Sequence, residues 1–210
     1  MPKGDHDALE RDLAAALDAG RLSDAATLAI RGYGPQILGY LGSVMRDDGL
    51  ADEAFSRFAE DLWKGIAGFR RESSLRTWAY RVAWNAARDL QTEAFRRRGR
   101  RLETAEISKV VQEVRSSSAS FLKEEARDKL DKLRRSLSPE DQTLLILRVN
   151  RELSWKEVAQ VLSTQDVPVD EPALRKRFER IKARLRKLAE EQGVLAGDPS
   201  GNPSGDPEAR

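Results

Sequence analysis

Cysteine is absent from this sequence of 210 residues, histidine occurs once, and aromatic residues make up only 6%. The lack of cysteine excludes a disulfide framework, thiolate metal sites and a cysteine nucleophile. The single histidine, His6, lies in a polar N-terminal stretch with no sign of a structured pocket. We therefore expect a protein that is not an enzyme and that carries no metal and no cofactor.

Long apolar runs are missing as well. No stretch approaches the roughly 18 apolar residues that a bilayer-crossing helix needs, and the N-terminus lacks the apolar segment of a secretion signal. These absences predict a cytoplasmic protein without membrane insertion.

Charge of both signs is abundant: 37 Lys and Arg residues stand against 35 Asp and Glu residues. Such a mixed composition is typical of solvated helices. Apolar residues recur at steps of three and four, and no strand-like alternation of useful length occurs. The predicted fold class is all-α, with two small helical domains joined by a flexible linker.

The predicted borders follow changes in composition, from apolar periodicity to stretches rich in Arg, Ser, Gly and Pro. They give an N-terminal extension with a short helix (1–22), a first helical domain (23–98), a linker (99–120), a second helical domain (121–192) and a disordered tail (193–210).

Three helix starts are predicted in the first domain before its longest helix. Ser23 has the side chain of an N-cap, and Pro35 fits the first turn of a further helix. Asp52 and Glu53 are carboxylates, which favour the N-terminus of a helix, and they mark the start of a third helix.

The longest predicted helix runs from about residue 75 to residue 96, with Ser73 or Ser74 as its cap. At about 100° per residue, one face is apolar and predicts the core: Leu75, Ala79, Val82, Ala86 and Leu90. A second face is a poor core and a good nucleic-acid surface: Trp78, Arg81, Asn85 and Arg88.

Helix caps and a concentrated positive charge mark the second domain. Ser138-Pro139 and Ser154-Trp155-Lys156-Glu157 fit helix starts, and a last helix begins at Asp170-Glu171-Pro172. Residues 174–188 carry a local charge of +7 in a chain of net charge +2. A basic helix after a short capped helix favours a DNA-binding helix-turn-helix. A solvated basic face, or a site for an acidic protein, would carry the same charge.

Two sets of residues form a recognisable combination. The first is Tyr33 to Leu38, Asp52-Glu53, Trp63, Phe69-Arg70, Glu72 to Ser74, Arg76 to Trp78, Tyr80-Arg81 and Asn85. The second is Leu137 to Glu140, Leu144 to Leu147, Leu153-Ser154, Glu157 to Ala159 and Arg175 to Arg186. Over residues 23–188 the chain thereby resembles bacterial RNA polymerase sigma factors of the extracytoplasmic-function (ECF) type, the first set resembling region two and the second region four.

The resemblance implies a non-catalytic initiation subunit that directs RNA polymerase to specific promoters. Its implied partners are promoter DNA and the polymerase core, contacted at the clamp helices of the largest subunit and at the beta flap. An anti-sigma factor is a further candidate partner. The implied polymerase-binding residues are Asp52, Glu53, Phe55, Ser56 and Arg57.

The resemblance also divides promoter recognition between the two domains. The first would capture unpaired bases of the minus-ten element through Arg70, Arg71, Glu72, Ser73, Ser74, Arg76, Trp78, Arg81, Asn85 and Arg88. The second would recognise the minus-thirty-five element through Arg175, Lys176, Arg177 and Arg180. The linker would thread toward the active cleft of the polymerase.

Three departures from the family pattern affect these implied roles. Ser56 and Arg57 replace an amide–carboxylate pair and Ala59 replaces an aromatic residue, which alters the implied polymerase contacts. Trp84 stands where Arg is common, so it would either join the path of the unpaired strand or, as we favour, pack on the preceding helix. Residues 163–169 make the helix-turn-helix connection longer than the family's tight turn.

Two other functions stay open on the residues alone. A stand-alone helix-turn-helix regulator would bind DNA without polymerase and use its N-terminal domain to dimerise or to bind a partner protein. A helical interaction protein that holds an acidic partner would bind no promoter specifically. Binding to core polymerase would distinguish a sigma factor from both of these alternatives.

Overall fold

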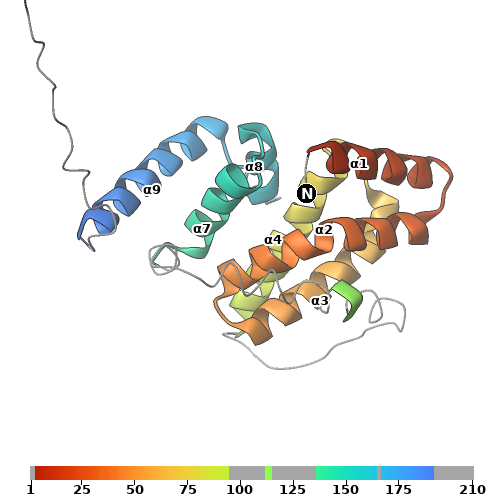
Figure 1. The fold of residues 1–210 in the computed structure, drawn as a ribbon, viewed down its shortest axis with the longest axis horizontal. Helices are drawn as coiled ribbons and strands as arrows, with labels where there is room; N and C mark the ends of the chain where they lie inside the picture. The colour runs from red at the N-terminus through yellow and green to blue at the C-terminus, as the bar shows by residue number, and fades with distance from the viewer. Residues whose placement is uncertain (1–2, 95–111, 115–135, 165–166, 192–210) are drawn as a thin grey trace, which may run out of the picture.

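The structure, a computed structural model, describes residues 3–94, 112–114, 136–164 and 167–191. Every element in these ranges is helical, which confirms the all-α prediction. Figure 1 shows two helical bundles, α1 to α4 and α7 to α9. Most of the predicted linker, the start of the predicted second domain and the predicted tail lie outside the described residues.

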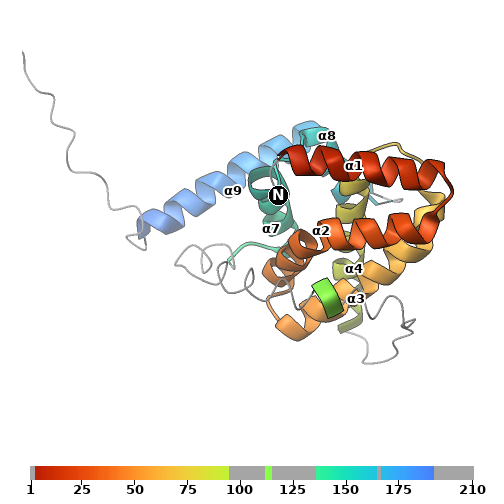
Figure 2. The same ribbon diagram turned by 45° about the vertical axis from the view of Figure 1, so that its right-hand side comes forward.

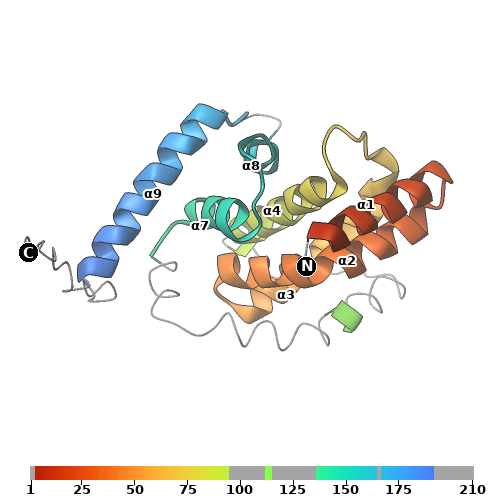
Figure 3. The same ribbon diagram turned by 45° about the horizontal axis from the view of Figure 1, so that its top comes forward.

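The first bundle consists of α1 (Lys3–Asp18), α2 (Leu22–Met45), α3 (Asp48–Gly65), the 3-10 turn η1 (Ile66–Gly68) and α4 (Leu75–Ala94). The second consists of α7 (Pro139–Leu145), the π-helical turn η2 (Ile146–Asn150), α8 (Trp155–Leu162) and α9 (Glu171–Glu191). Helix α1 lies along α2 (Figure 2), and α9 lies at the outer edge of the molecule, beyond α7 and α8 (Figures 1 and 3). Among the described helices, none combines the length and apolar character of a membrane span.

Helix α2 continues without a break through Pro35, so the prediction of a helix beginning there is wrong. A residue before proline is normally kept out of the helical conformation by a clash that involves its own Cβ, and Gly34 has no Cβ. The prediction of Ser23 as an N-cap is also wrong, because the helix begins at Leu22 and Ser23 lies in its first turn.

Helix α3 begins one turn before Asp52 and Glu53, which corrects the predicted start. Asp47 is the cap: its backbone is extended, and its carboxylate accepts a hydrogen bond from the Leu50 amide at 2.8 Å. A carboxylate that caps directly is a stronger start signal than carboxylates placed a turn later.

The helix starts predicted for the second bundle are confirmed. The Ser138 hydroxyl accepts a hydrogen bond from the Asp141 amide at 3.2 Å, and Ser154 and Glu157 form a reciprocal capping box. Helix α9 begins at Glu171, directly after the predicted restart at Asp170.

The first bundle buries α4 on more than the one predicted face. Of the predicted core stripe, Val82 alone is half-buried and the other members are buried. Further side chains of α4 are also buried: Trp78, Tyr80, Ala83, Trp84 and Ala87. Trp84 is 3% exposed, which agrees with packing rather than with a place on the path of the DNA strand.

Hydrogen bonds join the two bundles. The hydroxyls of Tyr40 and Thr143 lie 3.2 Å apart, and the Gln142 amide donates to the Ser43 carbonyl at 2.6 Å. Arg46 donates to the carbonyl of Leu137. The second bundle is therefore seated on α2, and its helix α8 packs against α4, next to the predicted minus-ten residues.

Candidate nucleic-acid interface

The predicted minus-ten residues lie on the loop between η1 and α4 and along α4 itself. The exposed members of the loop are Arg70, Arg71, Glu72 and Ser74. The Ser74 hydroxyl accepts a hydrogen bond from the Thr77 amide at 3.1 Å. Of Ser73 and Ser74, the two predicted candidates, Ser74 is therefore the cap of α4. Arg71 adopts φ 59° and forms an ion pair of 2.5 Å with Asp18 of α1.

Trp78 is part of the core rather than of the exposed face on which we predicted it. Its ring lies 5.3 Å from that of Phe69, and a Cβ at Gly65 would lie 3.3 Å from its edge. Only 9% of Trp78 is exposed. The helical repeat placed Trp78 beside Arg81, but it could not show that Gly65 and Phe69, on either side of η1, pack against Trp78.

Arg81, Asn85 and Arg88 do share one side of α4, where they line a cleft of about 890 Å³. The opposite wall comes from α8 and the start of α9 and includes Lys156, Gln160, Asp170 and Glu171. Two guanidinium groups and an amide suit phosphates and base edges better than an apolar ligand. Within the described ranges, no cluster of His, Asp and Glu side chains is arranged to hold a metal ion.

Arg76 and Thr77, at the start of α4, are engaged by the second bundle. The Arg76 guanidinium donates to the Arg151 carbonyl at 2.8 Å, and the Thr77 hydroxyl donates to Glu157 at 3.0 Å. The predicted minus-ten residue Arg76 is therefore half-buried at the junction between the bundles.

Glu157 has an unusual electrostatic environment because of these contacts. Burial alone would raise the pKa of its carboxyl, but hydrogen bonds from Ser154 and Thr77 and the charge of Arg76 outweigh burial and hold the pKa below the usual glutamate range. The ionised form is thus the one that the fold stabilises.

Replacing Glu157 by glutamine tests this electrostatic link. Because the folded-state pKa is lowered, ionised Glu157 stabilises the fold at neutral pH, and that stabilisation is lost as pH falls through the folded-state pKa. We expect Glu157→Gln to lower the free energy of unfolding by about 1 kcal/mol at neutral pH, because hydrogen bonds to a neutral group are weaker. Thermal unfolding of the wild-type and Glu157→Gln proteins at a series of pH values measures this difference in stability. A difference that stays constant into acid would contradict the prediction.

The predicted minus-thirty-five residues all lie on α9, where two of them form ion pairs and two do not. Arg175 forms a 3.6 Å ion pair with Glu171, and Arg177 forms a 2.5 Å ion pair with Asp141. Lys176 and Arg180 are exposed and form no ion pair within the described residues. These two side chains are therefore available to a polyanion without breaking an ion pair.

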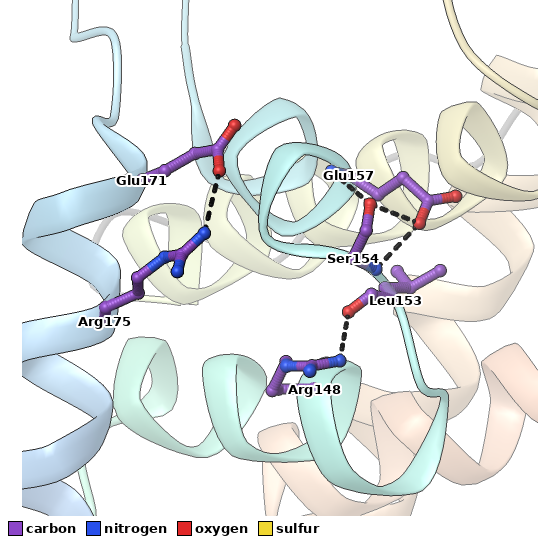
Figure 4. A network of polar contacts seen from close by, with 6 residues as sticks. All are labelled: Arg148, Leu153, Ser154, Glu157, Glu171 and Arg175. Atoms are coloured by element: carbon purple, nitrogen blue, oxygen red, sulfur yellow. Dashed lines mark hydrogen bonds and ion pairs between the residues drawn. The ribbon is translucent and has the colours of Figure 1, made fainter.

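A half-buried tryptophan, Trp155, anchors this surface. The Arg148 and Arg175 guanidiniums lie 5.1 and 5.6 Å from its ring centre, and the Phe178 ring meets it edge-on at 5.4 Å. Figure 4 shows the neighbouring polar contacts, in which Arg148 donates to the Leu153 carbonyl at 3.0 Å. Trp155 is thus mainly a packing anchor, as its residue type indicated, and it also holds Arg175 in place.

The predicted polymerase-binding residues divide into surface and core. On α3, Glu53 is exposed and Asp52 and Arg57 are half-buried, with Arg57 approaching Asp89 at 4.0 Å. Phe55 and Ser56 are only 0% and 3% exposed. The assignment of Phe55 and Ser56 to a docking surface is therefore corrected: both pack inside the first bundle.

Sequence reasoning missed the contacts that cross between the bundles. Thr77 was noted only as a member of the region-two set, and Glu157 only as a member of the region-four set and of a capping box, although the two residues hydrogen-bond across 80 positions. Arg151, which donates to the Gln36 carbonyl across 115 positions, also carried no signal. Such contacts have no local sequence pattern, because they depend on how distant helices meet.

Two comparisons with known proteins identify the family of this chain. Residues 29–101, which include α3, the loop and α4, match the family model described as Sigma-70 region 2. The chain is also 31% identical over 173 residues to the RNA polymerase sigma factor YlaC of Bacillus subtilis (strain 168). That alignment covers 78% of this chain and 94% of YlaC.

Fold, site and matches together define the class: this is a sigma factor, a non-catalytic subunit of RNA polymerase that supports promoter-specific initiation. Within that class, the chain belongs to the extracytoplasmic-function group.

Proposed function

We propose that this sigma factor recognises promoters at two places, with α4 and its preceding loop at the minus-ten element and α9 at the minus-thirty-five element. One observation carries the proposal: separate basic surfaces lie on different bundles, Arg81 and Arg88 in the cleft and Lys176 and Arg180 on α9. Separate surfaces suit two promoter elements, and the region-two match supports the role of the first.

At the minus-ten element, the first bundle holds bases that are already unpaired. Because Trp78 is buried, stacking and hydrogen bonding in the cleft are provided by Arg81, Asn85 and Arg88. Opening about ten base pairs costs roughly 1.4 kcal/mol per step, while each stacked base returns about 1–3 kcal/mol. Capture of one or two bases therefore cannot open a promoter alone, and the polymerase supplies the remainder.

At the minus-thirty-five element, α8 and α9 act as a helix-turn-helix with a lengthened connection. Arg175 and Arg177 are held by acidic neighbours, which restricts the directions in which they can reach base edges. Lys176 and Arg180 contact phosphates, a contribution that weakens with salt.

The two bundles separate when DNA binds. Four buried polar atoms beside their junction lack a hydrogen-bond partner within the described residues: Arg76 Nε, Asn85 Oδ1, Gln142 Oε1 and Arg151 Nε. Unpaired polar atoms of this kind favour a junction that can open. Separation frees Arg76 and widens the cleft for the strand.

Docking on the polymerase is assigned to the surface of α3, through Asp52, Glu53 and Arg57. The clamp helices and the beta flap remain the expected contacts on the polymerase. An anti-sigma factor stays a prediction of the family resemblance.

Transcription of a promoter library by core polymerase, with and without this protein, tests the proposed function. We expect specific transcripts only when both are present, and permanganate-reactive thymines at the minus-ten element of the promoters used. A stand-alone regulator would bind DNA but direct no initiation by core polymerase, and strand opening by the free protein would contradict the mechanism.

A further inference from the structure

The N-terminal helix α1 contacts both ends of the loop that precedes α4. Glu10 accepts hydrogen bonds from the backbone amides of Leu75, at 3.2 Å, and Arg76, at 2.9 Å. Asp18, at the other end of α1, forms the ion pair with Arg71. Eight residues of helix rise about 12 Å, so one rigid helix holds two points on either side of the loop.

The hydrogen bonds that Glu10 accepts complete the N-terminus of α4. A helix start leaves its first amides without a partner inside the helix. Of the first amides of α4, Ser74 accepts those of Thr77, through its side chain, and Trp78, through its carbonyl, at 3.1 Å each. The amides of Leu75 and Arg76 depend on Glu10, whose carboxylate also suits the positive end of the helix dipole.

Glu10 itself is firmly seated. The Tyr33 hydroxyl, on a side chain with 0% exposure, donates to the Glu10 carboxylate at 2.7 Å. Burial and this hydrogen bond raise the pKa of Tyr33, so the phenol keeps the proton that it donates. Leu9 fills the space beside Gly32, where a Cβ would lie only 2.3 Å from a Leu9 methyl. Glu10 and its neighbour Leu9 are thus both held against α2.

We propose that Glu10 is a positioning residue for capture of the minus-ten element. By fixing the first turn of α4 and, with Asp18, the loop from residue 71 to residue 76, it holds the capture segment in the shape that receives unpaired bases. This role rests on the proposed function of the loop and α4. Glu10 need not touch DNA, because it acts through the backbone amides of Leu75 and Arg76.

Hydrogen exchange of the free, full-length protein tests the geometry independently of transcription. In Glu10→Ala, we expect the amides of Leu75 and Arg76 to exchange about tenfold faster, while the Thr77 amide, held by Ser74, changes little. The matched control is Asp12→Ala, which removes an exposed carboxylate from the same helix. Glu10→Gln keeps one acceptor oxygen, so intermediate exchange is expected. Unchanged exchange in Glu10→Ala would overturn the proposal.

Reconstituted holoenzyme tests the functional consequence on a promoter selected from the library by the wild-type protein. With Glu10→Ala, we expect permanganate reactivity of the minus-ten thymines to fall about tenfold, equivalent to about 1.4 kcal/mol. Transcription from the same promoter carrying a premelted bubble should stay within about twofold of wild type, as should core-polymerase affinity, because these need less strand capture. Asp12→Ala should match the wild type throughout.

The outcomes separate the inference from the proposed function. Equal losses on duplex and premelted templates would show a general loss of folded protein, and equal behaviour of Glu10→Ala and Asp12→Ala would show no role; either overturns the inference while the proposed function stands. If the wild-type protein opens no promoter with core polymerase, the proposed function fails, and the role of Glu10 in capture fails with it.

Discussion

Replacing Lys176 and Arg180 together by alanine is expected to weaken binding of the holoenzyme to its promoter by more than about tenfold at about 50 mM salt. Both side chains are exposed on α9 and form no ion pair within the described part of the chain, so their contribution to DNA binding is not offset by a broken internal contact. Loss of two phosphate contacts should also reduce the slope of log affinity against log salt by about 1.8.

Fluorescence anisotropy of a labelled promoter fragment, titrated at several salt concentrations, measures both quantities. The matched control is Arg11→Ala with Arg21→Ala, which removes the same charge from exposed positions near α1. The control should retain wild-type affinity and slope. If both double variants lost affinity equally, net charge rather than the α9 surface would govern binding.

Replacing Phe55 by alanine is expected to lower the free energy of unfolding by about 3–5 kcal/mol, because it leaves a cavity in the core. Phe55 has 0% exposure, its ring lies 5.6 Å from that of Phe58, and its tip would lie 3.3 Å from a Cβ at Gly34. A loss of this size is a large part of the typical stability of about 5–15 kcal/mol. The resemblance alone had implied a polymerase contact for this residue.

Chemical denaturation followed by circular dichroism measures this loss. Glu53→Ala, an exposed change on the same helix, should alter stability by no more than about 0.5 kcal/mol and should instead weaken binding to core polymerase. A Phe55→Ala protein as stable as wild type but defective in polymerase binding would restore Phe55 to the docking surface.

The parts of the fold that were predicted correctly depend on local chemistry. Ser138, Ser154 and Glu157 cap helices through groups three residues away, so a short stretch of sequence contains the whole interaction. The predictions at Ser23 and Pro35 were wrong because a serine also fits the first turn of a helix, and because Gly34 lets the helix continue into Pro35. A start signal carries weight only when the residues before it cannot be helical.

The candidate site was predicted less completely than the fold. The helical repeat placed Arg81, Asn85 and Arg88 on one side of α4, and the structure has them in one cleft. The same repeat placed Trp78 with them, although packing against Phe69 removes it from the surface. Periodicity reports which residues share a face, but it does not report what covers that face.

The sequence by itself determined the helical class, the capped helix starts of the second bundle and the concentration of positive charge on α9, because each depends on residues close together along the chain. Only the tertiary structure decided that Phe55 and Trp78 are buried, that Thr77 meets Glu157, and that Glu10 caps a helix that begins 65 residues later. Burial and capping across such distances depend on how the helices pack, and that packing is a property of the whole chain.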